Sequence, residues 1–513
     1  MTEANERGKT WLRLAIAFGL FSAGYAIINF ELMKHVILYR AAANDWTTAT
    51  TAFLGISLQA VALLLLTMAL PRRWFGAMLV LVCLSGLVNL GYGLIVGDVI
   101  DTAKIAWVIA EFGQAGAAAG EFAGLAGASF AGAIGAGLLF VLARKAGGPA
   151  LAGRALKWPA ALGVAAVLLA VDFGGLGPVA AERNTYSYVA DVLTAEPPPA
   201  RAKVAASLQA APKVDKVIWL IDESVVDATF RKIVLPGLGS FGPVDFGEAH
   251  SLGNCSAPSN VALRSGVPVA RVGAGTDLRS TPSIWGYARK AGFRTTLIDG
   301  QTTGPVQNLL LPPERALIDS YAPAHDGVDT DIRIARKINA LLKSPDRQFV
   351  YAVLQGAHFQ YRDHYPPGFV APGAPLMAQY EGAVGWSKRG FFEALFAGVD
   401  RDRVAVFYTS DHGQNVRDGV LPHCSAAPVP AEFSVPLLAF LPASLAAPYR
   451  ASPAGGRSHG QIFPATMLLL GYGRDDALAY DNDLDRPTQR VVWFGRNVIP
   501  VEAGQPIEVH AAR

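Results

Sequence analysis

Charged side chains are scarce in this chain. Asp, Glu, Lys and Arg make up 17% of its 513 residues, against about a quarter in ordinary soluble domains. Cysteine is scarcer still: the three cysteines allow at most one disulfide bond, which excludes a scaffold held together by several. The net charge of +3 says little about partners, and no nucleic-acid partner is expected. The mean hydropathy of +0.30 instead indicates that part of the chain lies in a membrane.

The first third of the chain contains long stretches without any charge. Most of these runs are long enough to cross a hydrocarbon core of about 30 Å as a helix. We therefore predict five transmembrane helices within residues 1–173, of which the last is the shortest. The first run could instead be a signal peptide, but no small-residue cleavage site follows it, which favours a retained helix. The uncharged runs are 14–30, 46–70, 74–97, 122–143 and 158–171.

Basic residues between these runs predict how the chain is oriented. Lys and Arg lie before the first run, between the second and third, and between the fourth and fifth, whereas the loop at 98–121 is mainly acidic. The positive-inside rule then places the N-terminus in the cytoplasm. Five spans place the rest of the chain on the other side, which in a bacterium is the periplasm. We therefore expect a multi-pass protein of the bacterial inner membrane.

Two of the three cysteines, Cys255 and Cys424, belong to the exported part. An oxidising compartment permits a disulfide between them, and two free thiols are the alternative, because the sequence does not report their separation.

Residues 174–213 are predicted to form a connector, with a short surface helix near 186–193. From 214 to 513, apolar runs of strand length alternate with helical patterns. Continuous apolar strands between amphipathic helices predict an α/β domain with a central, mainly parallel sheet covered on both faces. The predicted strands are 217–221, 295–298, 349–354, 404–408, 435–441 and 490–494, and the predicted helices are 283–291, 329–342 and 380–398.

Chemically reactive side chains follow the predicted strands. Glu223 ends one apolar run, and Asp411 and His412 end another. Ligands of such sheets bind at the carboxyl ends of the strands, and two carboxylates, an imidazole and the hydroxyl of Ser256 make a tetrahedral zinc set. A metal beside Ser256 would make its hydroxyl a nucleophile. Seven of the nine histidines fall between 250 and 459, and a histidine near a phosphoryl centre can donate hydrogen bonds to its oxygens or protonate a leaving alkoxide.

These motifs resemble those of the bacterial inner-membrane phosphoethanolamine transferases, which include the enzymes that modify lipid A and belong to the alkaline phosphatase/sulfatase superfamily. The similar segments are Asp222-Glu223-Ser224, Asn254 to Ser259, Gly356 to Pro366, Ser410 to Gly413 and Asp418 to His423. The resemblance implies five spans, a periplasmic sulfatase-like catalytic domain and a covalent phospho-enzyme.

Carried over residue by residue, the resemblance makes Ser256 the nucleophile. Glu223, Ser256, Asp411 and His412 are then ligands of one zinc ion, and a second ion during turnover stays open. His358 and His423 become catalytic residues. It also implies a membrane phospholipid as donor and an envelope glycolipid, such as the lipid A of lipopolysaccharide, or another lipid as acceptor.

The chain departs from the family pattern in ways that leave other functions open. Glu223-Ser224 is also similar to lipoteichoic acid synthases and other phosphoglycerol transferases, so another head group could be moved. Ser256-Ala257-Pro258-Ser259 is similar to the sulfatase signature, although Asn260 stands where sulfatases have arginine. A phosphodiester or sulfate ester hydrolase is therefore a further alternative, and a non-catalytic binding protein is the last.

Overall fold

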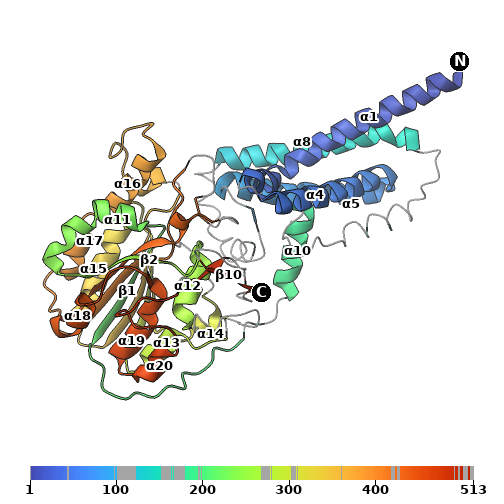
Figure 1. Cartoon of the computed structure of the whole chain (residues 1–513). Coiled ribbons are helices and arrows are strands. Elements are labelled where there is room, and N and C mark those ends of the chain that lie inside the picture. The colour runs from blue at the N-terminus through green and yellow to red at the C-terminus, as the bar shows by residue number, and fades with distance from the viewer. Residues whose placement is uncertain are drawn as a thin grey trace. The chain divides into compact units, whose positions relative to one another are not determined.

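The computed structural model describes most of the chain. It leaves out residues 1, 43–44, 97–98, 101–104, 106–122, 152–162, 164–165, 167–179, 195–196, 198, 267–277, 279, 302–307, 309, 360, 418–421, 424–427, 490, 495–496, 501–506 and 509–513. The chain divides into two compact units, Met1–Glu196 and Pro197–Arg513 (Figure 1).

The first unit is helical and apolar, as the sequence predicts. Four of its helices contain segments long and apolar enough to cross a membrane, namely Gly8–Ile28, Trp46–Ala69, Arg72–Leu94 and Gly124–Gly147. The fifth predicted span, 158–171, lies almost entirely outside the described residues. The helices of this unit are α1 (Thr2–Ile28), α2 (Phe30–Met33), η1 (Lys34–Tyr39), α3 (Arg40–Ala42), α4 (Trp46–Ala69), α5 (Arg72–Val96), α8 (Ala123–Leu151) and α10 (Ala181–Thr194).

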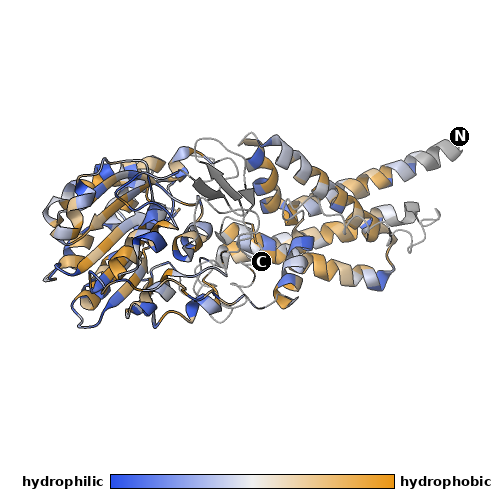
Figure 2. Ribbon diagram, turned by 60° about the horizontal axis from the view of Figure 1, so that its bottom comes forward, coloured by the Kyte–Doolittle hydropathy of each residue, from blue (hydrophilic) through white to orange (hydrophobic). Residues whose placement is uncertain are grey.

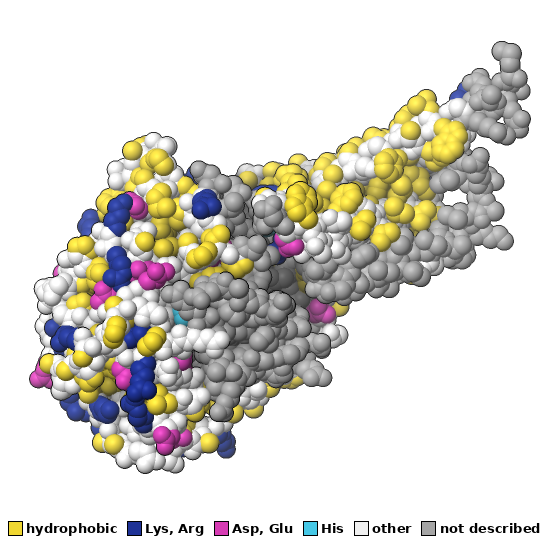
Figure 3. Space-filling view, in the orientation of Figure 1, with side chains coloured by type: hydrophobic (Ala, Val, Ile, Leu, Met, Phe, Trp, Pro, Cys, Tyr) yellow, Lys and Arg dark blue, Asp and Glu magenta, His cyan; other side chains and the backbone are white. Residues whose placement is uncertain are grey.

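Large apolar side chains point outward from these helices. Trp11, Trp46 and Trp74 are each more than 60% exposed. Hydrophobic residues predominate along the long helices of the unit in Figure 2, and apolar side chains cover much of their described surface in the space-filling view of Figure 3. Burying so much apolar surface in lipid is favourable, whereas leaving it in water is not. The first unit therefore has the surface of a membrane-embedded helical bundle.

Helix α10 is fastened to the ends of two of these helices by buried polar side chains. Asn29, which follows α1, accepts a hydrogen bond from the backbone N–H of Ala181 at 2.7 Å, and Asn89 of α5 donates to the Ala181 carbonyl at 3.1 Å. The short helix predicted near 186–193 is thus the second half of a longer one.

The second unit is built on an eight-stranded sheet in the order β4-β3-β5-β1-β6-β7-β2-β8. The first five strands in this order run parallel, and β7 runs antiparallel to both of its neighbours. The mainly parallel sheet predicted from the sequence is confirmed. The strands are β1 (Lys216–Asp222), β2 (Val244–His250), β3 (Arg294–Asp299), β4 (Ser320–Pro323), β5 (Gln348–Val353), β6 (Val404–Ser410), β7 (Ser434–Phe440) and β8 (Arg457–Ser458).

Helices cover both faces of this sheet, which explains why its central strands β1, β5 and β6 are buried at every position. Alternate residues of β1 enter two different cores: Trp219 lies in the one covered by α13 and α19, and Leu220 in the one covered by α11, α15, α16 and α17. The helices are α11 (Asp227–Ile233), η3 (Leu235–Phe241), α12 (Ser256–Ser265), α13 (Ile284–Lys290), α14 (Pro312–Arg315), α15 (Thr330–Leu342), η5 (Tyr361–His364), α16 (Leu376–Ser387), α17 (Phe391–Phe396), η6 (Pro430–Glu432), α18 (Ala443–Arg450), η7 (His459–Gln461), α19 (Ile462–Leu470) and α20 (Arg474–Leu478).

Two details of the sequence prediction are wrong. The strand predicted at 490–494, β9 (Val491–Phe494), joins a separate three-stranded sheet with β10 (Asn497–Pro500) and β11 (Ile507–Glu508). The single helix predicted at 380–398 is two helices: α16 ends at Ser387, and α17 begins after Gly390, whose φ of +64° is not helical.

Gly266 tests how tightly the helix that begins at Ser256 is packed. It ends α12 with a φ of +54°, and a Cβ there would lie 2.2 Å from the ring of Phe463. We expect Gly266→Ala to lower the free energy of unfolding by about 1–3 kcal/mol through overpacking, in addition to backbone strain of about 1 kcal/mol.

Denaturant unfolding of the full chain in detergent, followed by tryptophan fluorescence, measures this loss. Gly292→Ala is the matched control, because Gly292 has a φ of +82° but open space around its Cβ position. Equal losses in the two variants would show that the contact with Phe463 is unimportant.

Candidate active site

Three metal-ligand side chains meet where two neighbouring parallel strands end. Glu223 follows β1, and Asp411 and His412 follow β6, whose last residue pairs with Asp222 in the register. All three side chains are at most 1% exposed, and one ligand atom from each lies within 4.8 Å of the others. Parallel pairing places both carboxyl ends at the same edge, and the site follows from that.

The ligand atoms point toward one another. The Nε2 atom of His412 lies 3.5 Å from Oε1 of Glu223 and 3.6 Å from Oδ2 of Asp411. Its Nδ1 lies 2.8 Å from the Gly413 carbonyl oxygen, so Nδ1 carries the proton and donates, which leaves the Nε2 lone pair facing the carboxylates. The buried Oδ2 of Asp411 has no hydrogen-bond partner among the described residues. A cation between these atoms would satisfy all of them, so the residues fit a metal ion.

The pKa values of the two carboxyl groups show the same need for positive charge. Burial alone would raise the pKa of Glu223, but the nearby imidazoles, His412 foremost, outweigh it and bring the pKa down to about 2. Burial and the negative charge of Glu223 raise the pKa of Asp411 well above its usual range. Two carboxylates this close cannot both be charged unless a cation joins them.

Ser256 is the first residue of α12. Its hydroxyl oxygen lies 3.1 Å from Nε2 of His412 and donates toward Oε2 of Glu223 at 3.2 Å. The first turn of a helix has backbone N–H groups without helical partners and favours negative charge. A phosphoryl group on Ser256 would therefore lie at the positive end of a ten-residue helix.

The two predicted catalytic histidines extend the row begun by His412. The ring centroid of His423 lies 4.6 Å from that of His412 and 5.3 Å from that of His358. His423 is held by Gln414, whose Oε1 lies 2.9 Å from its Nδ1, and burial lowers its pKa well below the usual value, with help from the two neighbouring imidazoles. His358 is exposed. The structure thus brings together all six residues singled out in the sequence, and their roles remain predictions.

Two residues that the sequence did not single out hold the carboxylates in place. Ser224 has a φ of +62°, an uncommon conformation for a residue with a side chain. There its backbone N–H donates to Oδ1 of Asp411 at 3.1 Å and its hydroxyl donates to Oε1 of Glu223 at 2.7 Å. The Gln301 amide donates to Oε2 of Glu223 at 2.6 Å. Nothing in the sequence distinguishes a glutamine with this role from a surface glutamine.

A buried ion cluster lies directly behind Glu223. The Lys388 ammonium group is 2.8 Å from Oδ2 of Asp222 and 2.7 Å from Oδ2 of Asp331, and all three side chains are at most 1% exposed. Asp331 also accepts hydrogen bonds from the backbone N–H groups of Gln355 and Gly356. The cluster therefore fixes both the end of β1 and the turn that leads to His358.

His459 acts as a structural residue beside the site. Its Nε2 accepts a hydrogen bond from the Leu252 N–H at 2.7 Å, and its Nδ1 lies 3.0 Å from the Ser410 carbonyl oxygen. Burial lowers its pKa to about 3, so it is neutral and joins the segments before Ser256 and Asp411.

Cys255, immediately before Ser256, is disulfide-bonded, and Cys83 is free. The predicted partner of Cys255, Cys424, lies outside the described residues.

Comparison with known proteins supports the fold across both units. Residues 244–472 match the Sulfatase family, and no curated protein matches the chain. The integral membrane protein lipooligosaccharide phosphoethanolamine transferase A (EptA) from Neisseria meningitidis has a TM-score of 0.52 at 15% identity, covering 92% of this chain and 97% of that one.

The C-terminal periplasmic domain of EcEptC from Escherichia coli, in complex with Zn, has a TM-score of 0.50 at 15% identity, covering 59% of this chain and 97% of that domain. The chain thus has a sulfatase-type domain and shares the fold of these transferases, including the full-length membrane protein. The resemblance seen in the sequence is confirmed at this level.

The raised pKa of Asp411 predicts how zinc should stabilise the protein at different pH values. In the metal-free protein the folded state holds a proton on Asp411 more tightly than the unfolded state does. This contribution to stability is therefore present at low pH and lost as the pH rises through the raised pKa. Zinc needs the carboxylate unprotonated, so the rise in unfolding temperature on adding zinc should be larger near pH 8 than near pH 5.

Thermal unfolding of the full chain in detergent, with and without zinc, measures this difference. Asp411→Asn should lose most of the zinc-dependent rise at both pH values. A rise in the native protein that is as large near pH 5 as near pH 8 would contradict the assignment of Asp411 as a ligand.

The cluster behind Glu223 gives a separate prediction. Lys388→Met leaves Asp222 and Asp331 buried without their cation, which should cost about 3–5 kcal/mol of unfolding free energy and weaken zinc binding. Adding Asp331→Asn to this variant removes one of the two unpaired charges and should restore part of the loss.

Denaturant unfolding and zinc titration of the native protein, Lys388→Met and the double variant test the ion pairs of Lys388. Lys343→Met, which removes an exposed lysine after α15, is the control and should change neither quantity. If Lys388→Met matches that control, the cluster does not support the site.

Proposed function

We propose that the protein transfers a phospho-alcohol head group from a membrane phospholipid to an envelope glycolipid such as lipid A, through a covalent intermediate on Ser256. Phosphoethanolamine is the head group we favour. The observation that carries the proposal is the position of the Ser256 hydroxyl at the start of α12. It lies 3.1 Å from Nε2 of His412 and 3.2 Å from a carboxylate oxygen of Glu223. The described part of the same chain contains four apolar helices of membrane-spanning length.

Zinc is the metal we propose for this site. Glu223, Asp411, His412 and Ser256 would hold it, and three oxygens and one nitrogen suit its tetrahedral preference. The fold neighbour from Escherichia coli forms a complex with Zn, which supports the choice. When bound, the ion would polarise the phosphoryl oxygen and acidify the serine hydroxyl.

In the first step the Ser256 oxygen forms a bond to phosphorus and the bond from phosphorus to the diacylglycerol oxygen breaks. The serine hydroxyl donates its hydrogen bond to Oε2 of Glu223, which orients the oxygen, and its proton passes to water, because a carboxylate with a pKa of about 2 is too weak a base to keep it. The departing alkoxide needs a proton, and the exposed imidazole of His358 is placed to supply it, with His423 behind it. The helix N-terminus stabilises the negative charge that collects on the phosphoryl group.

In the second step an acceptor oxygen attacks the same phosphorus and Ser256 is released. His358, now without its proton, can accept one from the acceptor hydroxyl. The fold neighbour from Neisseria meningitidis is a lipooligosaccharide phosphoethanolamine transferase, which supports a glycolipid as acceptor and phosphoethanolamine as cargo. We further propose that residues 1–173 span the bacterial inner membrane, that 174–213 form a connector, and that 214–513 form the catalytic domain in the periplasm.

Two other functions remain as candidates. A phosphoglycerol or related head-group transferase would use the same residues with a different donor lipid and another envelope lipid or a glucan as acceptor. An ester hydrolase, with water in place of the acceptor, is favoured by the match of residues 244–472 to the Sulfatase family.

The intact mass of the full chain after incubation with zinc and mixed bacterial phospholipids distinguishes these candidates. We expect an added mass equal to one phosphoethanolamine group, which should be absent from Ser256→Ala. Ser265→Ala, the same change at the far end of the same helix, should still acquire the mass.

A phosphoglycerol mass would change the donor and keep the mechanism. Release of free head group without an adduct would indicate a hydrolase. An adduct that persists in Ser256→Ala would rule out Ser256 as the nucleophile.

A further inference from the structure

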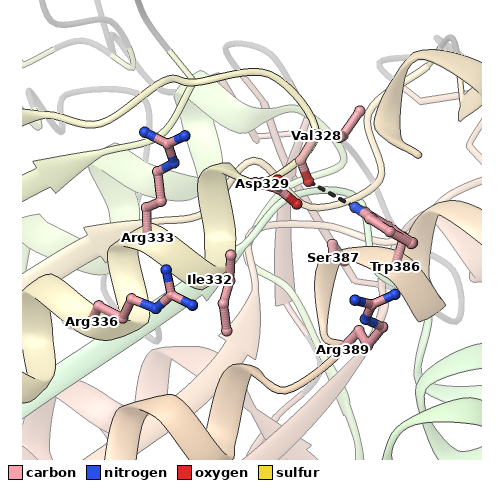
Figure 4. A pocket seen from close by; sticks show the side chains of 8 residues that line it. All are labelled: Val328, Asp329, Ile332, Arg333, Arg336, Trp386, Ser387 and Arg389. Atoms are coloured by element: carbon pink, nitrogen blue, oxygen red, sulfur yellow. Dashed lines mark hydrogen bonds between the residues drawn. The ribbon is translucent and has the colours of Figure 1, made fainter. Parts of the chain in front are cut away.

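A cavity separate from the candidate active site lies on the second unit, between the first turns of α15 and the end of α16. It has a volume of about 420 Å³, within the usual range for small-molecule sites. Figure 4 shows its lining, in which Arg336 rises from α15 and Arg389 from the segment after α16, with Ile332 between them and Trp386 beside Arg389. We call it the arginine pocket.

The arginine pocket carries more positive than negative charge. It is lined by three arginines and one carboxylate, that of Asp329. Arg333 forms an ion pair with Asp326, whereas neither Arg336 nor Arg389 has a carboxylate partner among the described residues. Guanidinium groups stay charged at physiological pH, so two unpaired cations open onto one cavity. An anion there would relieve their repulsion.

One of the two arginines is held in place before any ligand arrives. The guanidinium carbon of Arg389 lies 4.4 Å from the ring centroid of Trp386. The ring of Trp386 is itself fixed, because its Nε1 donates to the Val328 carbonyl at 3.1 Å and it packs edge-on against Phe369. A preorganised guanidinium group loses less entropy on binding.

The pocket and the candidate active site share a wall. Asp331 and Lys388 are sequence neighbours of the pocket residues Ile332, Ser387 and Arg389, but their buried side chains join Asp222 instead, immediately before Glu223. The same two chain segments therefore line the pocket on one side and support the proposed zinc ligand on the other.

From these observations we infer that the arginine pocket binds a phosphate group carried on a sugar ring. Planar guanidinium groups bind phosphate oxygens in pairs, and the apolar surface of Ile332 and Trp386 suits the face of a sugar. On the proposed function, on which this inference rests, the ligand is a phosphorylated sugar of the acceptor glycolipid. The pocket would then select phosphorylated acceptors without touching the reacting atoms.

Direct binding tests the pocket independently of turnover. We would titrate the metal-free full chain in detergent with glucose 1-phosphate, because metal-free protein has no zinc to bind phosphate. Saturable binding is expected, about tenfold weaker in Arg336→Gln and in Arg389→Gln. Arg294→Gln is the control. It removes an exposed arginine at the first residue of β3, at the end of the strand opposite to the candidate active site, and this variant should bind like the native protein.

Three results would overturn the inference: no binding by the native protein, equal binding by all four proteins, or equal binding of unphosphorylated glucose. If inorganic phosphate binds as tightly as glucose 1-phosphate, the sugar part of the inference fails and the site takes free phosphate.

A transfer assay then separates the pocket from the proposed function. With a phosphorylated acceptor glycolipid, Arg336→Gln and Arg389→Gln should raise the acceptor KM about tenfold, and with the dephosphorylated acceptor they should change it little. Equal effects on both acceptors would overturn the link to the acceptor. Absence of transfer by the native protein would refute the proposed function. The binding titration would still show whether the arginine pocket binds a sugar phosphate.

Discussion

Two carboxylates buried side by side are the constraint on which the second unit depends. Glu223 and Asp411 lie at the ends of adjacent parallel strands, sealed from water, where their mutual repulsion can be relieved only by positive charge. The neighbouring groups meet this need in part: the first turn of α12 presents its positive end with Ser256, and Ser224 donates a hydrogen bond to each carboxylate. The unpartnered Oδ2 of Asp411 marks what remains for a metal ion to satisfy.

The residue before Glu223 also has a buried carboxylate, but its charge is stabilised in a different way. Asp222 is also fully buried, but its charge is balanced within the protein by Lys388, which Asp331 shares. The last position of β1 thus receives its cation from the protein itself, while the carboxylates that follow the strand ends are left for a bound metal ion. The ion cluster therefore supports the candidate site directly from behind.

The sequence predicted the elements of the site that follow from strand periodicity. Continuous apolar runs located β1 and β6, and the rule that parallel strands share an edge then brought Glu223, Asp411 and His412 together. Lys388 could not be found in this way. It stands between Ser387 and Arg389 in a stretch with the composition of a polar helix surface, and only the tertiary structure brings it to its buried partners Asp222 and Asp331. The positive φ of Ser224 and the contact of Gln301 with Glu223 likewise depend on tertiary packing that no local pattern records.

The strand order also has a consequence for how the protein is made. Lys216 at the start of β1 pairs with Gln348 on one side and Val404 on the other, so the central strand emerges first during synthesis and has no neighbours until well over a hundred residues later. Such distant pairing makes folding slow, because the chain must lose the entropy of closing a long loop before the strand contacts that stabilise it can form. Ser256, the two carboxylates and the imidazole therefore remain apart in the growing chain and meet only when β6 arrives, so the candidate site cannot assemble before residue 412 has been made.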